Sequence, residues 1–321
     1  MVGLGIAGAA IAAISSYQAP YDVVVVVDDP ISGSVVIKGV RYDTSLTSLD
    51  LSNRGLTNAD IEPLKHMTKL VDLDLSVNQI SDIGVLRDLP SLERLSLGMN
   101  PLSDFSVLFE LPNLKYLELF SCGITDVSEI VGLANLVELN LSLNPIGDVS
   151  PLGSMTNLKS LIVSEVNLRD LSPFAGMSNL ETLSVSDTQI SDISALAGLT
   201  NLTLLSLPNN QITDISVIAG LTKLKTLSIG NNQISDISAL ASLPSLEFLF
   251  IYGNRVSDLE PLRGLGATLR GLHIDGNDIS NVEPLFGLSH LDHLYLAGNP
   301  LTAEQIAALR QALPYCYDLN P

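Results

Sequence analysis

The residues best suited to carry chemistry lie near the C-terminal end, where an aromatic residue or a histidine recurs every 22 or 23 positions. The group consists of Phe248, Phe250, Tyr252, His273, Asp275, His293 and Tyr295. Clustered aromatic rings are typical of partner-binding surfaces, and imidazole adds a group that titrates near neutral pH. Histidine and carboxylate are also metal ligands, so a metal site at His273, His293 and Asp275 is a weaker alternative. A third interpretation is that a cap or a neighbouring molecule covers the rings.

A second group of residues that could carry chemistry is a series of nine aspartates spaced 22 residues apart. They are Asp82, Asp104, Asp126, Asp148, Asp170, Asp192, Asp214, Asp236 and Asp258. Calcium needs six to eight converging oxygens, whereas this spacing supplies one carboxylate per repeat. A short acid before a helical turn instead accepts hydrogen bonds from the unpaired N–H groups at the start of that turn. We therefore predict capping residues and no metal.

Enzymatic chemistry finds no support in the sequence. The chain has no glycine-rich phosphate loop, no G-x-S-x-G and no H-E-x-x-H. Its 16 basic and 35 acidic residues give a net charge of −19, which argues against a nucleic-acid partner. Two cysteines in 321 residues exclude a disulfide scaffold. We predict a protein that is not an enzyme and that needs no cofactor.

The element that must position these residues is an internal repeat. From Leu46 onward the pattern L-x-x-L-x-L-x-x-N-x-[IL]-x-D recurs, and eight consecutive intervals are 22 residues. The leading leucines are Leu46, Leu70, Leu92, Leu114, Leu136, Leu158, Leu180, Leu202, Leu224, Leu246, Leu269 and Leu291. Alternate leucines, such as Leu73 and Leu75, predict a short strand with one buried face, and the rest of each repeat has room for a 3₁₀ turn. The length alone suggests two domains, but the repeat predicts one continuous array.

An asparagine follows the strand in most repeats, where its amide can bond the neighbouring coil. It is replaced at Val166 and Thr188, so we expect a weak or distorted ladder around residues 160 to 190. The pattern resembles the leucine-rich repeat, in the 22-residue subclass of bacterial internalins and eukaryotic phosphatase-regulating proteins. The resemblance implies an α/β repeat solenoid: a horseshoe with a parallel β-sheet on its concave face and short 3₁₀ or turn segments on its convex face.

The chain outside the array is expected to supply its ends. Residues 1–20 form an apolar segment that is a signal peptide, a membrane anchor through residues 2–17, or a buried structural segment. Residues 21–45, which include five consecutive valines, predict a β-rich N-terminal cap. The array spans 46–301. Residues 302–321 predict a C-terminal cap of one helix and one strand, opened by a capping box at Thr302.

The repeat register places the aromatic residues on the solvent-facing side of the sheet. Those faces take 36 of the 276 positions from residue 46 onward, so chance would place about two of the twelve aromatics there, yet six occupy them. Besides the C-terminal group, Tyr116 and Phe120 form a second patch. It is mixed with acids such as Asp72, Asp74 and Glu118, and would suit a partly basic partner.

The expected function is a module that binds a protein or peptide on its concave sheet, at the cell surface or secreted. The alternative is an intracellular regulatory scaffold subunit of an enzyme such as a protein phosphatase. Both follow from the resemblance, because a fold does not choose its ligand. The location of the native protein and the fate of residues 1–17 would separate them. The oligomeric state is left open.

Overall fold

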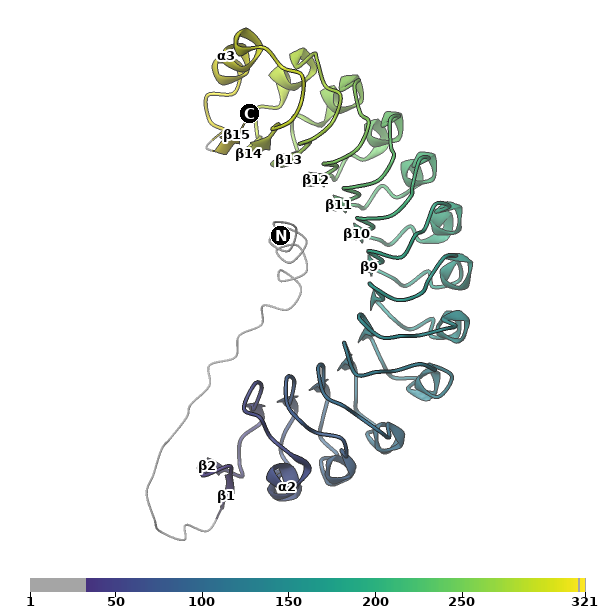
Figure 1. Cartoon of the computed structure of the whole chain (residues 1–321), viewed down its shortest axis with the longest axis vertical. Helices are drawn as coiled ribbons and strands as arrows, with labels where there is room; N and C mark the ends of the chain where they lie inside the picture. The colour runs from purple at the N-terminus through teal and green to yellow at the C-terminus, as the bar shows by residue number, and fades with distance from the viewer. Residues whose placement is uncertain (1–32, 317, 321) are drawn as a thin grey trace. The chain divides into compact units, whose positions relative to one another are not determined.

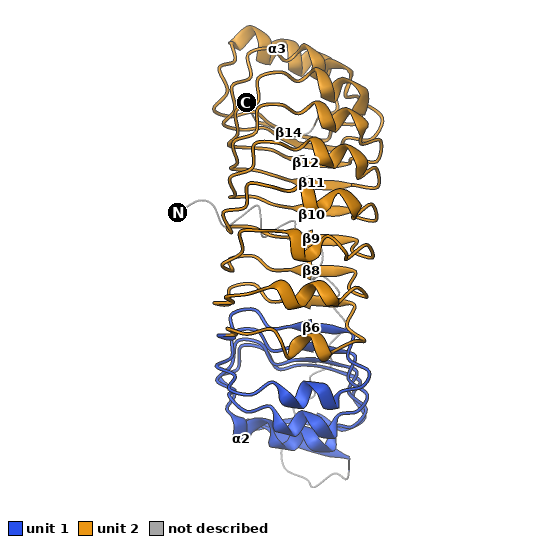
Figure 2. Ribbon diagram, turned by 90° about the vertical axis from the view of Figure 1, so that its right-hand side faces the viewer, with its two compact units in different colours: residues 1–123 blue, residues 124–321 orange. Residues whose placement is uncertain are grey.

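The computed structural model describes residues 33–316 and 318–320 and divides into two compact units after Gly123 (Figure 2). This division falls within the predicted array. The predictions for residues 1–20 and for the valine run lie outside the described residues.

The described part of the first unit begins with an antiparallel hairpin and continues as a parallel sheet. Strand β1 (Ser34–Ile37) pairs with β2 (Val40–Asp43), so the described part of the N-terminal cap is β-structure. The strands of the parallel sheet are β3 (Ser48–Asp50), β4 (Asp72–Asp74), β5 (Arg94–Ser96) and β6 (Tyr116–Glu118). Its helical segments are α2 (Asn58–Ile61), η1 (Glu62–His66), η2 (Gly84–Asp88) and η3 (Ser106–Glu110).

The second unit repeats the same coil and ends in a helix and a strand. Its strands are β7 (Glu138–Asn140), β8 (Ser160–Ile162), β9 (Thr182–Ser184), β10 (Leu204–Ser206), β11 (Thr226–Ser228), β12 (Phe248–Phe250), β13 (Gly271–His273), β14 (His293–Tyr295) and β15 (Asp318–Asn320). The helical segments are η4 (Ile130–Gly132), η5 (Ser150–Ser154), η6 (Ser172–Phe174), η7 (Ser194–Gly198), η8 (Ser216–Gly220), η9 (Ser238–Ser242), η10 (Glu260–Leu265), η11 (Glu283–Gly287) and α3 (Ala303–Ala312). Within this unit the strands lie on the inner side of the coils and the helical turns on the outer side (Figure 1).

A column of apolar side chains fills each coil between the strand and the helical turn. In one repeat Leu202, Leu205 and Leu207 are fully buried, and the turn contributes Ile215 and Ile218. Each coil is too small to bury this surface alone, so adjacent coils must stack to exclude water. The excess of leucine is therefore the core of the solenoid.

Asparagine side chains tie most coils to the one before. Asn232 Oδ1 accepts a hydrogen bond from the N–H of Ile212, at 3.0 Å. Its Nδ2 donates to the carbonyl oxygens of Leu207, Ile229 and Gly230, at 3.0 to 3.2 Å. One buried amide thus satisfies backbone groups at the tight turn after the strand, where no ladder partner is available.

The expected weakening of the asparagine ladder around residues 160 to 190 is present. Where Val166 and Thr188 replace the amide, the N–H groups of Ile146 and Leu168 bond carbonyl oxygens two residues back, at 2.8 Å, and Gln189 has left-handed backbone with φ 67°.

Serine side chains add a separate set of bonds between these coils. The N–H of Ser164 donates to Ser142 Oγ, and the N–H of Ser186 donates to Ser164 Oγ. The Ser186 hydroxyl also donates to Ser164 Oγ, at 2.7 Å. The backbone ladder continues there, with Glu165 N–H donating to Ser186 O at 2.9 Å.

The aspartates at regular spacing cap the helical turns, as predicted. Asp192 Oδ1 accepts the N–H of Ser194 at 2.8 Å, and all nine make the same bond two residues ahead. That backbone N–H, with the Ser194 side chain, lowers the pKa of Asp192. The C-terminal capping box is also present, with Thr302 N–H donating to Gln305 Oε1 at 2.8 Å.

A turn with left-handed backbone follows every strand of the repeat. Seven residues after each leading leucine, φ lies between 52° and 74° in all twelve coils. Asparagine, aspartate and glycine fill most of these positions, since they tolerate that conformation. Val77 has φ 58°, and as a β-branched residue it does not tolerate left-handed backbone well. It is more than a third exposed.

Replacing Val77 with asparagine is expected to raise the free energy of unfolding by about 1 kcal/mol, because it relieves left-handed strain and removes an exposed apolar group. Urea denaturation of the wild type and V77N measures the change. Val36, exposed in β1, is the matched control, and V36N should give no gain. A V77N protein less stable than the wild type would contradict this account.

Candidate ligand-binding surface

A stack of three rings runs across the last strands of the second unit. Phe250, His273 and Tyr295 occupy paired positions on β12, β13 and β14, as the repeat register predicts. The ring centroids of Phe250 and His273 are 4.6 Å apart, and those of His273 and Tyr295 are 4.1 Å apart with 18° between planes. We call these three residues the ring stack. Both faces of the His273 ring are covered, so the ring edges are what the stack can present to a ligand.

Asp318, on the terminal strand β15, fixes the end of the ring stack and was missed by the sequence reasoning. Its carboxylate accepts a hydrogen bond from the Tyr295 hydroxyl, and its Oδ2 lies 3.9 Å from His293 Nδ1. The hydrogen bond that the Tyr295 hydroxyl donates to Asp318 raises the pKa of Tyr295. Leu319 could have indicated this strand, because it pairs with Leu294 in the same register as the leucines of the repeats.

Burial changes the chemistry expected of His273. Loss of water, and to a smaller extent the nearby His293, lower the pKa of His273 from 6.5 to about 4, while Asp318 acts in the opposite direction. The imidazole is therefore neutral at pH 7. A response of His273 near neutral pH, which the sequence suggested, is not supported.

The His273 imidazole is expected to titrate near pH 4 in an NMR titration. The pKa of His273 in the folded protein lies below its unfolded value of 6.5. Its contribution to the free energy of unfolding is therefore fully present above pH 6.5 and is lost as the pH falls toward 4. Comparing the wild type with H273N across that window isolates the contribution. A midpoint near 6.5 in the folded protein would refute the assignment.

Three other aromatic rings of the predicted set lie over glycines of adjacent strands. A Cβ atom at Gly230 would lie 2.4 Å from the Tyr252 ring, and one at Gly271 would lie 2.7 Å from the Phe248 ring. In the first unit, Phe120 covers Gly98 in the same way, at 2.1 Å. A ring over a glycine shields backbone that has no side chain of its own. Part of the aromatic excess on the sheet thus has a structural cause. The sequence carries a signal for it, because each ring has a glycine at the equivalent position of an adjacent repeat.

The polar members of the C-terminal group flank the ring stack. Asp275 is half-buried, its Oδ1 accepts the N–H of Ala297 at 3.1 Å, and burial raises its pKa. His293 is exposed. Among residues 33–316 and 318–320, no three His, Cys, Asp or Glu side chains are grouped as metal ligands.

Tyr116 and Phe120 lie in the first unit, and we describe them apart from the ring stack. The Arg94 guanidinium lies 3.8 Å from the centroid of the Tyr116 ring. The Ser96 hydroxyl donates to Glu118 at 2.9 Å. Phe120 is half-buried beside these residues. This surface is therefore acidic with one basic group stacked on a ring.

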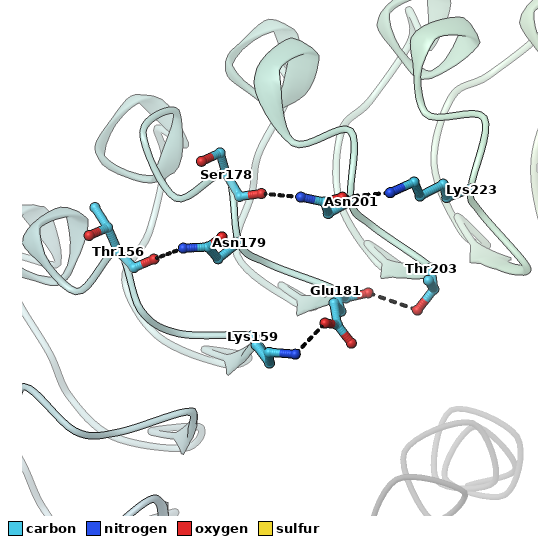
Figure 3. Close-up of polar contacts among 8 residues, drawn as sticks. All are labelled: Thr156, Lys159, Ser178, Asn179, Glu181, Asn201, Thr203 and Lys223. Atoms are coloured by element: carbon cyan, nitrogen blue, oxygen red, sulfur yellow. Dashed lines mark hydrogen bonds and ion pairs between the residues drawn. The ribbon is translucent and has the colours of Figure 1, made fainter.

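The polar flank of the middle repeats in the second unit is engaged in contacts between coils (Figure 3). Lys159 pairs with Glu181 at 2.7 Å, and Asn179 Nδ2 donates to Thr156 O at 2.8 Å. One repeat further, Asn201 Nδ2 donates to Ser178 O at 2.9 Å. These side chains stabilise the stacking of coils. The sheet face of β8 to β11 carries no charged residue.

Family models define the class of the protein. A model described as leucine rich repeat matches residues 44–102, and one described as leucine rich repeats (2 copies) matches 112–154, 156–198, 178–220, 200–242 and 222–264. The chain belongs to the leucine-rich-repeat family, and the predicted fold class is confirmed. No curated protein matches the chain.

Solved structures place the chain among internalin-like proteins. It is 35% identical to an internalin (inlF) from Listeria monocytogenes, with a TM-score of 0.74, covering 87% of this chain and 82% of that one. It is 39% identical to internalin C2 of the same organism, with a TM-score of 0.54, over 61% and 83% of the two chains. The Arabidopsis receptor kinase HAESA, solved with the peptide hormone IDA and the co-receptor SERK1, shares the fold at 22% identity, with a TM-score of 0.65 over 84% and 52%.

The part of the chain that the structure describes contains no helix with the length and apolarity needed to cross a bilayer. Residues 2–17, predicted as a candidate anchor, lie outside that part.

Proposed function

We propose that this protein is a non-enzymatic module that binds a protein or peptide on the strand face of its second unit, at the cell surface or after secretion. The observation that carries the proposal is the ring stack of Phe250, His273 and Tyr295. Rings aligned across three strands offer a partner a continuous surface of ring edges. Because His273 is neutral at pH 7, the stack itself carries no charge.

Ring edges are the positive part of an aromatic quadrupole, so they favour carbonyl oxygens and the faces of other rings. A peptide with an aromatic or aliphatic side chain above His273, and backbone carbonyls nearby, fits this chemistry. Asp275 and His293 would supply polar contacts at the rim of the interface. The similarity to internalins supports an extracellular location. The alternative of an intracellular phosphatase scaffold rests on the repeat period alone.

Capture from host and bacterial extracts on the immobilised full chain tests the proposal. The wild type should retain a defined protein, and a variant with Phe250 and Tyr252 both replaced by serine should not, although both proteins fold. Circular dichroism checks the folding. If the variant retains the same partner equally well, the ring stack is not the binding site.

The cellular location is tested by fractionating the native protein and examining residues 1–17. A cleaved or membrane-embedded segment supports the extracellular proposal. An intact chain found in the cytosol would contradict it and favour the intracellular scaffold.

A further inference from the structure

Two apolar residues in the first unit occupy turn positions that their backbone conformation does not favour. Val77 and Met99 have φ values of 58° and 56°, and their side chains are 36% and 50% exposed. Asparagine or glycine occupies the same position in six coils. The fold therefore does not require an apolar side chain at this position. Backbone strain at residues of this kind is concentrated at functional sites.

Backbone hydrogen bonds place these two residues and Phe120 in adjacent coils. The N–H of Val77 donates to Gly98 O at 2.8 Å, and the N–H of Met99 donates to Phe120 O at 2.7 Å, so the residues come from three successive coils. The Phe120 ring lies over Gly98, the residue directly before Met99. We call Val77, Met99 and Phe120 the apolar ridge.

Carboxylates line the strand face beside the apolar ridge. Asp74 precedes Val77 by three residues, and Glu118 lies on β6 two strands away, separated by Ser96. The solvent-facing positions of β3 to β6 also include Asp50 and Asp72, against the single basic residue Arg94. Arg94 lies against the Tyr116 ring. Burial raises the pKa of Asp72, and the positive charge of Arg94 partly opposes that rise.

From this juxtaposition we propose that the first unit binds a segment of a partner protein in which lysine or arginine residues alternate with aliphatic or aromatic ones. The apolar side chains would cover the ridge, and the basic ones would meet Asp74 and Glu118. Charge complementarity identifies this occupant, because an anionic membrane or a nucleic acid would be repelled by the same carboxylates. The surface is separate from the ring stack and does not depend on its function.

The test uses the full chain and a fluorescent synthetic peptide in which pairs of lysines alternate with pairs of leucines. Binding is followed by fluorescence anisotropy at near-physiological salt, which screens long-range attraction to a protein of net charge −19. Replacing Val77 and Met99 together with asparagine should weaken binding about tenfold or more, and D74N with E118Q should do the same.

Matched controls separate the apolar ridge from general surface effects. Phe109 is 41% exposed on η3, and F109N should bind as the wild type, as should D88N on η2. The variant Phe250→Ser should also bind this peptide normally, so the two surfaces can fail independently. Because asparagine fits the left-handed turn, the double ridge variant should melt no lower than the wild type.

Three results would overturn the proposal. The first is no binding of the lysine–leucine peptide to the wild type. The second is equal binding of a lysine–glutamine peptide, which would mean that net charge alone attracts it. The third is unchanged binding to the Val77 and Met99 double variant.

Discussion

Replacing Asn232 with leucine is expected to lower the free energy of unfolding by about 3 kcal/mol or more. Leucine has a similar volume but cannot bond the Ile212 N–H or donate to the carbonyls of Leu207, Ile229 and Gly230. Those backbone groups are buried with the amide, so water cannot replace the lost partner without opening the turn. Urea unfolding followed by circular dichroism measures the effect.

An exposed asparagine in the preceding coil offers a control of the same residue type. Asn209 is exposed and left-handed, with φ 57°, and its side chain bonds other exposed side chains. Asn209→Gly keeps the backbone conformation and should change stability by less than about 0.5 kcal/mol. A similar small loss for Asn232→Leu would mean that the amide ladder does not stabilise the stack.

Replacing His273 with serine is expected to weaken binding of a captured partner by about 2 kcal/mol, and Phe250→Ser by a similar amount. His273 holds the centre of the ring stack, so its loss leaves Phe250 and Tyr295 without a ring between them. Isothermal titration calorimetry at pH 7 gives the affinities. The imidazole is uncharged at that pH, so the loss should vary little with salt.

The rings that cover glycines provide the comparison for this prediction. Phe248→Ser and Tyr252→Ser should each weaken binding by less than about 1 kcal/mol, because these rings lie over Gly271 and Gly230. The order of the four losses distinguishes a stack-centred site from a uniformly aromatic one. Equal losses at all four positions would show that the glycine-covering rings also contact the partner.

The regular features of the fold could be predicted because one physical requirement recurs in every repeat. Leucines at alternate positions bury one strand face, and an aspartate two residues before an N–H caps the next turn. The last helix follows equally from local chemistry, with Thr302 and Gln305 in a capping box. Each of these depends on residues close in sequence, or one period away.

The features that were missed depend on contacts between side chains of different coils. The serines at 142, 164 and 186 form a hydroxyl ladder of their own only because they lie one above another in successive coils. The low pKa of His273 requires rings on both of its faces, and the role of Asp318 requires the register of a strand outside the repeat. The register predicted which residues share a column, but not which way each ring leans.

The two irregular repeats show where this chain can change length. The interval from Leu46 to Leu70 is two residues longer than the usual 22, and α2 (Asn58–Ile61) takes up the difference on the side away from the strands. The interval from Leu246 to Leu269 is one residue longer, and there Leu269 N–H bonds Leu265 O, four residues back. In both cases the strands keep their pairing. Genetic insertions and deletions should therefore accumulate in the outer turns, while the strand face changes only by substitution or by gain and loss of whole repeats.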